Sequence, residues 1–247
     1  MGKLNYEWVK ASLEMADNEK SKLTERERDL FGLSSIRLRC LINNLCAAEK
    51  VNYLEIGCYK GATLISAARG NDVTAVGVDN FKYDDREPNK WAPEGYIWDN
   101  MKSQLDTNIN TYRLQPDVVN GESISIIESD FQKADLPKNK FNVCFFDISP
   151  VDEASYEEFF NHVLPSLTQS SVVIFSQQSN HVHANHLNDA ITKYSNSVNS
   201  QFNEKRVSGS NADATKYYSG IRIFGFVKKA VSKTDTKTSN NTQVKND

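Results

Sequence analysis

The sequence predicts an α/β protein built on a mostly parallel β-sheet with helices on both faces. Short continuous apolar runs alternate with helical patterns along the middle of the chain, as in parallel strands joined by crossover helices. Glycines and acidic residues directly follow several of these runs, where sheets of this kind bind ligands. With 247 residues, 39% of them hydrophobic, the chain can form one large domain or two small ones.

Seven segments are predicted to be strands, and the last two form an antiparallel hairpin. The strands are expected over residues 51–56, 73–78, 123–128, 141–146, 172–175, 202–207 and 217–227. The predicted helices between them cover residues 62–69, 98–112, 152–160 and 181–194. We therefore divide the chain into an N-terminal helical extension (1–48), one domain (49–230) and a flexible polar tail (231–247).

Two capping signals lie in the N-terminal extension. Thr24 and Glu27 have the spacing of a capping box, and Ser34 or Ser35 could begin a further helix.

Composition argues against several classes of function. Lys and Arg number 29 and Asp and Glu 32, a formal charge of −3, which does not fit broad nucleic-acid binding. No apolar run approaches the roughly 18 residues of a membrane span, and the first residues lack the apolar block of a secretory signal. The four cysteines show no zinc-type spacing, so we expect reduced thiols in a cytoplasmic protein.

A glycine loop follows the first predicted strand. Residues 55–61 read EIGCYKG, which contains Gly57 and Gly61. Small residues in a strand-to-helix turn let the backbone approach a ligand, and the following helix offers free N–H groups. The two glycines could also serve chain geometry alone. The spacing is neither the G-x-G-x-x-G of a dinucleotide fold nor a P-loop.

Asp79 ends the second predicted strand, about 20 residues beyond the loop. An acid at that place and distance accepts hydrogen bonds from ribose hydroxyls. Helix capping or simple exposure at the surface is the alternative. The glycine loop and Asp79 together predict a ligand that contains a nucleoside.

Four segments together resemble the motif series of class I S-adenosylmethionine-dependent methyltransferases. They read YLEIGCYKG (53–61), VGVD (76–79), ESDF (128–131) and FFD (145–147). The order and strand placement match over residues 51–175, and the final hairpin resembles the closing strands of the family. The resemblance implies a Rossmann-like, doubly wound fold with S-adenosyl-L-methionine as cofactor, bound by the domain 49–230. Within the family, small-molecule O-methyltransferases are the most similar.

The resemblance also assigns roles to residues around the cofactor. It implies that Glu55, Gly57, Tyr59 and Gly61 line the methionine part of the cofactor. Asp79 would bind the ribose.

Further roles concern the adenine end and the acceptor. The resemblance implies that Asn80 and Phe81 flank the adenosine, that Asp130 faces the adenine amino group, and that Phe131 lies beside the ring. Asp147 would lie near the sulfonium and the acceptor.

The sequence departs from the family pattern in two places. Ser149 and Pro150 replace an Asp-His pair, and residues 176–178 (SQQ) stand where metal-dependent members have further acidic residues. Hard cations prefer carboxylate oxygens. We therefore predict chemistry without a required metal.

Asp147 and His181 are the predicted catalytic residues. His181, His183 and His186 follow the strand that ends near residue 175, so they are expected at the ligand edge. One of them could remove a proton from the acceptor, and His183 and His186 could share a helix face, a weak sign of a metal site. Solvated histidines at a helix start are the alternative.

The segment 81–95 is long for a connection and carries aromatic residues, so it would form either a lid over an acceptor or a satellite hydrophobic cluster. The N-terminal helices would either cover the acceptor site or form a homodimer contact. The sequence leaves both choices open.

The resemblance therefore implies an enzyme that transfers a methyl group from S-adenosylmethionine to a small-molecule or glycan-like acceptor, and it is the resemblance alone that implies oxygen as the acceptor atom. Two alternatives stay open: a nicotinamide-dependent oxidoreductase, and a protein that binds a nucleoside cofactor without catalysis.

Overall fold

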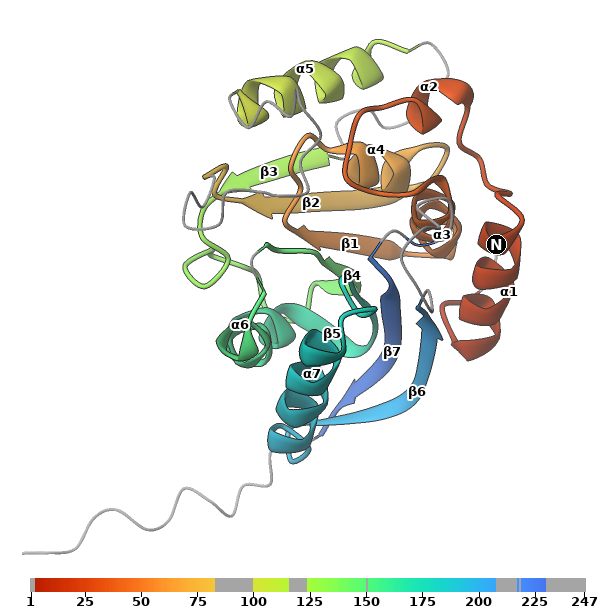
Figure 1. Ribbon diagram of the computed structural model, residues 1–247. Helices are drawn as coiled ribbons and strands as arrows, with labels where there is room; N and C mark the ends of the chain where they lie inside the picture. The colour runs from red at the N-terminus through yellow and green to blue at the C-terminus, as the bar shows by residue number, and fades with distance from the viewer. Residues whose placement is uncertain are drawn as a thin grey trace, which may run out of the picture.

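The computed structural model describes residues 3–82, 100–115, 124–149, 151–207, 217 and 219–229. The strands of this part of the chain form one seven-stranded sheet in the order β3-β2-β1-β4-β5-β7-β6 (Figure 1). They are β1 Val51–Ile56, β2 Val73–Asp79, β3 Ile124–Glu128, β4 Phe141–Phe146, β5 Leu167–Phe175, β6 Val198–Arg206 and β7 Ile221–Lys228. The first five are parallel, and β7 runs antiparallel to β5 and β6. The predicted sheet and C-terminal hairpin are confirmed.

Helices cover both faces of the sheet (Figure 1). They are α1 Tyr6–Asp17, α2 Glu25–Arg28, α3 Ile36–Cys46, α4 Ala62–Ala68, α5 Met101–Arg113, α6 Glu153–Glu158 and α7 His181–Lys193. Apolar side chains of α1, α3, α4 and α5 share one core with one face of the sheet. Those of α6, α7 and the π-helical turn Phe159–Val163 share a second core with the other face. The helices of the predicted N-terminal extension therefore pack into the same core as the sheet.

Helices α2, α3 and α6 each begin at a capping side chain, and the caps of α2 and α3 are those that the sequence indicates. Glu27 accepts hydrogen bonds from the backbone N–H and the hydroxyl of Thr24, at 2.9 and 2.6 Å, in a capping box. The hydroxyl of Ser35, rather than that of Ser34, accepts from the N–H of Leu38 at 3.2 Å and caps α3. Asp152 caps α6.

Two predicted strands begin later than the real ones. Strand β5 begins at Leu167 and not at residue 172, and β6 begins at Val198 and not at residue 202. Leu167 and Val198 themselves are buried, but residues 168–170 and 199–201 after them are polar and mostly exposed, so no apolar run marks these strand starts. They are extended because they pair with β7: Ser170 lies opposite Val227, and Val198 opposite Lys228.

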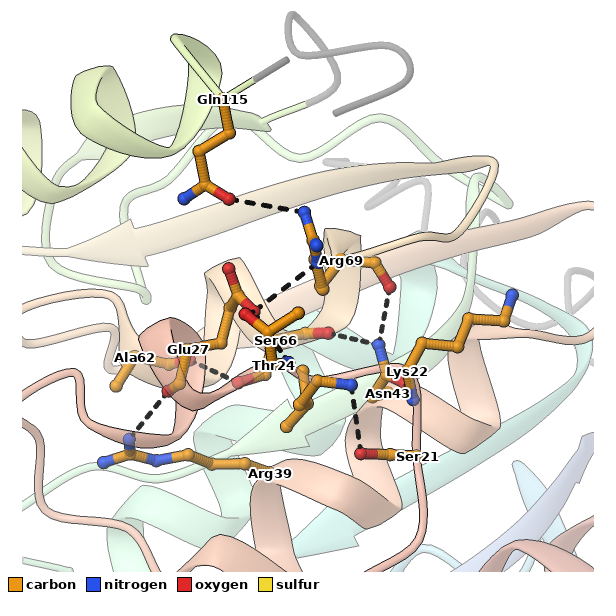
Figure 2. A network of polar contacts seen from close by, with 11 residues as sticks. Ser21, Lys22, Thr24, Glu27, Arg39, Asn43, Ala62, Ser66, Arg69 and Gln115 are labelled. Carbon is orange, nitrogen blue, oxygen red and sulfur yellow. Dashed lines mark hydrogen bonds and ion pairs between the residues drawn. The ribbon is translucent and has the colours of Figure 1, made fainter. Parts of the chain in front are cut away.

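A polar network fastens the segment before α3 to helix α4 (Figure 2). The amide of Asn43 donates to the carbonyl oxygens of Ser66 and Arg69, both at 2.8 Å, and its oxygen accepts from the N–H of Lys22 at 2.9 Å. The Arg69 guanidinium lies 3.5 Å from the Glu27 carboxylate, and the two side chains are 8% and 1% exposed. Buried polar groups need partners of this kind, so the N-terminal segment has one fixed position on α4.

None of the helices described is long and apolar enough to cross a membrane.

Candidate functional site

The order of the strands reverses between β1 and β4, because β2 and β3 lie on one side of this pair and β5 lies on the other. Ligands of open α/β sheets bind beyond the carboxyl ends of the strands at such a point. The glycine loop leaves β1 there, and Asp147 follows β4. The N–H of Asp147 donates to Ile56 at 2.8 Å, and the N–H of Gly57 donates to Val78 at 2.9 Å. The structure thus brings the first and fourth predicted motifs together.

Gly57 occupies the position where the two loops come closest. Its φ is +88°, a conformation that side chains disfavour, and a Cβ atom on it would lie 2.0 Å from the carbonyl oxygen of Asp147. Only glycine fits between the two strand ends.

The carboxylate of Asp79 holds the glycine loop. One of its oxygens accepts from the N–H groups of Cys58 and Tyr59, both at 2.8 Å, and the other accepts from the N–H of Phe81 at 2.8 Å. A carboxylate has about four lone-pair sites, so about one stays available for a ligand. Asp79 therefore has a structural role that its position in the sequence does not indicate.

Asn80 and Asp130 connect the ends of β2 and β3. The Asn80 amide donates to one Asp130 oxygen at 2.8 Å, and Lys133 donates to the other at 3.0 Å. These hydrogen bonds, that of Asn80 first, lower the pKa of Asp130. Phe131 is buried, and the edge of its ring meets Phe146 with 5.4 Å between the centroids. The predicted adenine-side residues thus lie at one edge of the sheet.

Glu55 is fully buried, and both its oxygens are engaged inside the protein. The hydroxyls of Tyr53 and Thr63 each donate to it at 2.6 Å. Burial raises the pKa of Glu55 to about 8, and the two hydrogen bonds oppose that rise. These contacts tie β1 to the first turn of α4. A direct contact of Glu55 with a cofactor stays a prediction.

The raised pKa of Glu55 makes the effect of Glu55→Gln on stability depend on pH. Between pH 4.5 and about 8 the unfolded chain binds fewer protons than the folded one, so this group lowers folding stability as the pH rises. We expect the free energy of unfolding of the variant, relative to that of wild type, to rise by roughly 2–4 kcal/mol from pH 5 to pH 9. Urea unfolding at the two pH values measures this gain, and an equal difference at both would contradict the buried carboxyl.

Asp147 is half-buried and bonded to the loop that follows β5. The Ser176 hydroxyl donates to it, and Gln177 contributes a further hydrogen bond. Burial raises the pKa of Asp147 to about 6, and the charge of Asp79 adds to this rise. The two hydrogen bonds act in the opposite direction and lower the pKa. At pH 7 the side chain is therefore mostly ionised.

The three histidines differ in position. His181 is exposed at the first residue of α7, whereas His183 and His186 are half-buried. The buried Nδ1 atoms of His183 and His186 have no hydrogen-bond partner in the described part of the chain. Burial lowers the pKa of His183, while a hydrogen bond with the backbone of Gln177 raises it. Gln177 is also the residue whose side chain bonds Asp147. His183, unlike the exposed His181, thus contacts the loop that follows β5.

The hydrogen-bond partners of the predicted site residues are only partly predictable from the sequence. Tyr53 precedes Glu55 by two residues on one strand face, a signal that alternation along a strand could have supplied. Thr63 and Ser176 have no such signal, because they reach the site from other elements. Pro150 and residues 83–95 of the predicted lid lie outside the described residues, so their roles stay predictions.

Comparisons with known proteins bear on the fold. No family model and no curated protein matches the sequence. The structure is similar to that of a proposed S-adenosyl-L-methionine-dependent methyltransferase from Methanococcus maripaludis (TM-score 0.53, 11% identity, covering 95% of this chain and 99% of that one). It is also similar to the O-methyltransferase TomG of Streptomyces achromogenes, involved in tomaymycin synthesis and solved in complex with S-adenosylmethionine (TM-score 0.52, 15% identity, covering 89% and 90%). The chain therefore has the Rossmann-like fold of the class I S-adenosylmethionine-dependent methyltransferases.

Proposed function

We propose that this protein is an S-adenosylmethionine-dependent methyltransferase that acts on a small-molecule or glycan-like acceptor, at oxygen and without a required metal. The observation that carries the proposal is the meeting of strand ends at the switch in strand order. There the Gly57 backbone touches that of Asp147, while Asp79 holds the same loop. Asp130 lies on the same edge, one strand beyond Asp79.

The polar groups at this edge fit the cofactor. A ribose hydroxyl can donate to the remaining lone pair of Asp79. Asp130 uses two of its four lone-pair sites for Asn80 and Lys133, so an adenine amino group can donate to it. Both side chains are only half-buried. Asp79 and Asp130 would therefore hold the two ends of an adenosine.

The bound cofactor supplies a methyl group that its sulfonium has already activated. The protein then has to hold the acceptor in line and keep water away. In the proposed reaction Asp147 accepts a hydrogen bond from the acceptor hydroxyl. A histidine of α7 takes the proton: His181 was predicted from the sequence, and the contacts of His183 with Gln177 support His183 instead.

One observation favours a second candidate function. Ser176 and Gln177 already occupy the Asp147 carboxylate, which would suit a protein that binds a nucleoside cofactor without catalysis. Calorimetry with S-adenosylmethionine and NAD, together with methyl incorporation over a broad acceptor panel, separates the candidates. Binding of NAD alone would point to an oxidoreductase. Activity that a chelator removed and magnesium restored would contradict the metal-independent reaction.

Asp79→Ala tests the cofactor site. We expect affinity for S-adenosylhomocysteine to fall about ten- to a hundredfold, because a hydrogen bond to a charged group contributes roughly 1.5–3 kcal/mol. The loop also loses its acceptor, so Asp79→Asn is the matched control: it keeps one oxygen for the amides of Cys58 and Tyr59. Weak binding in both variants, with near-normal stability in Asp79→Asn, supports a direct contact. Unchanged affinity in both would remove Asp79 from the site.

A further inference from the structure

Arg39 shapes the turn between α2 and α3. It is 3% exposed, and its side chain points toward the main chain of Glu27 (Figure 2). Its guanidinium donates to the carbonyl oxygens of Glu27, Arg28, Leu30 and Gly32 at 2.7–3.4 Å. A further bond joins it to the Ser34 hydroxyl at 2.9 Å. One buried cation thus binds four carbonyl oxygens at the end of α2 and in the turn, and gives the turn a defined shape.

The turn carries Phe31 to the glycine loop. The ring centroid of Phe31 lies 6.3 Å from that of Tyr59. Phe31 is nevertheless 50% exposed. An exposed aromatic face therefore stands beside the loop that leaves β1 at the switch in strand order.

Lys60 lies against both rings. Its Nζ is 4.7 Å from the centroid of Phe31 and 5.2 Å from that of Tyr59, and the residue is only 9% exposed. Among the residues that the structure describes, no carboxylate lies within ion-pair distance of this ammonium. Two aromatic faces offset the loss of water only in part.

Two other lysines that lie over aromatic rings differ in this respect. Lys10 and Lys102 also lie over rings, yet they pair with Glu7 at 3.7 Å and with Asp106 at 2.6 Å. The charge of Lys60 has no such counterpart in the described part of the chain, although it is more buried than either.

The loop favours a carboxylate over a phosphate as the anion. Phosphate sites in loops use several backbone N–H groups. Here the N–H groups of Cys58 and Tyr59 already donate to Asp79, and that of Gly61 donates to Cys58 at 2.8 Å. The ammonium of Lys60 carries one positive charge, which a carboxylate balances one to one.

We propose that Lys60, held between Phe31 and Tyr59, binds a carboxylate of a ligand at this edge of the sheet. The inference rests on the proposed function for the place of the ligand. The carboxylate belongs either to the amino-acid end of the cofactor or to an acidic acceptor, whose planar part would pack on Phe31.

Lys60→Met tests the subsite with two pairs of probes. S-adenosylhomocysteine is compared with 5′-methylthioadenosine, which lacks the amino-acid end, and benzoate is compared with benzyl alcohol, with and without saturating S-adenosylhomocysteine. We expect a loss of about ten- to a hundredfold in affinity for the carboxylate member of one pair. The affinity for the other probe of that pair, which lacks the carboxylate, should change less than about twofold. Calorimetry and NMR titration measure both pairs.

The outcomes identify the source of the carboxylate. A loss confined to S-adenosylhomocysteine assigns Lys60 to the cofactor, and one confined to benzoate assigns it to the acceptor. Lys60→Arg should keep the affinity within a few-fold, whereas Lys10→Met, remote on α1, should change neither pair. Equal affinities of wild type and Lys60→Met for all four probes would overturn the proposal. If wild type bound no nucleoside, the proposed function would fail, while the benzoate arm would still decide the role of Lys60.

Discussion

Gly57→Ala is expected to abolish detectable binding of S-adenosylhomocysteine and to destabilise the fold by about 2–5 kcal/mol. A side chain at φ +88° is strained, and its Cβ would lie 2.0 Å from the carbonyl oxygen of Asp147. Backbone strain and overpacking each cost about 1–3 kcal/mol. Neither atom in the clash belongs to a flexible side chain, so relief requires the ends of β1 and β4 to separate. Calorimetric titration and urea unfolding measure the two effects.

Gly70→Ala is the matched control for this variant. Gly70 also has a positive φ, +65°, but its Cβ would meet the flexible side chain of Lys22 at 3.1 Å. We expect a loss of roughly 1–2 kcal/mol from the left-handed conformation and unchanged ligand binding, because Gly70 follows α4 at its other end. Equal binding losses in Gly57→Ala and Gly70→Ala would show that the effect is global and not one of the site.

Glu27→Ala is expected to destabilise the protein by about 3–5 kcal/mol, the range for breaking a buried ion pair on one side. The carboxylate accepts both hydrogen bonds of Thr24 and lies 3.5 Å from Arg69. The change removes the cap of α2 and one buried carboxylate partner of the Arg69 guanidinium, which is 8% exposed. Urea unfolding measures the loss.

A variant in an exposed ion pair tests whether the burial of Glu27 and Arg69, and not the distance between them, causes the expected loss of stability. Glu157 lies 2.5 Å from Lys193, closer than Glu27 lies to Arg69, but its side chain is 29% exposed and that of Lys193 57%. Exposed pairs contribute about 0–1 kcal/mol. We therefore expect Glu157→Ala to cost less than about 1 kcal/mol. A similar cost for Glu27→Ala would mean that the network of Figure 2 does not hold the N-terminal segment.

The central strands were predictable because their signal is local. Strands β1 and β4 are buried on both faces and read as continuous apolar runs, so their predicted bounds match those of the structure. The starts of β5 and β6 were not predictable, because polar residues are extended there only through pairing with β7. The role of the buried Asn44 in α3 was not predictable either. Its amide donates to the carbonyl oxygens of Ser12 and Lys20, from segments more than 20 residues away.

The sequence by itself determined which strand ends carry glycines and acids, because a strand, its turn and the next helix form from neighbouring residues. Only the tertiary structure decided what those side chains contact. Asp79 accepts hydrogen bonds from the glycine loop, and Glu55 accepts them from Tyr53 and Thr63. Phe31 lies beside Lys60. These contacts depend on distances between segments that are remote in the chain. The strand order of the sheet decides which of those segments come close, and spacing in the sequence does not reveal that order.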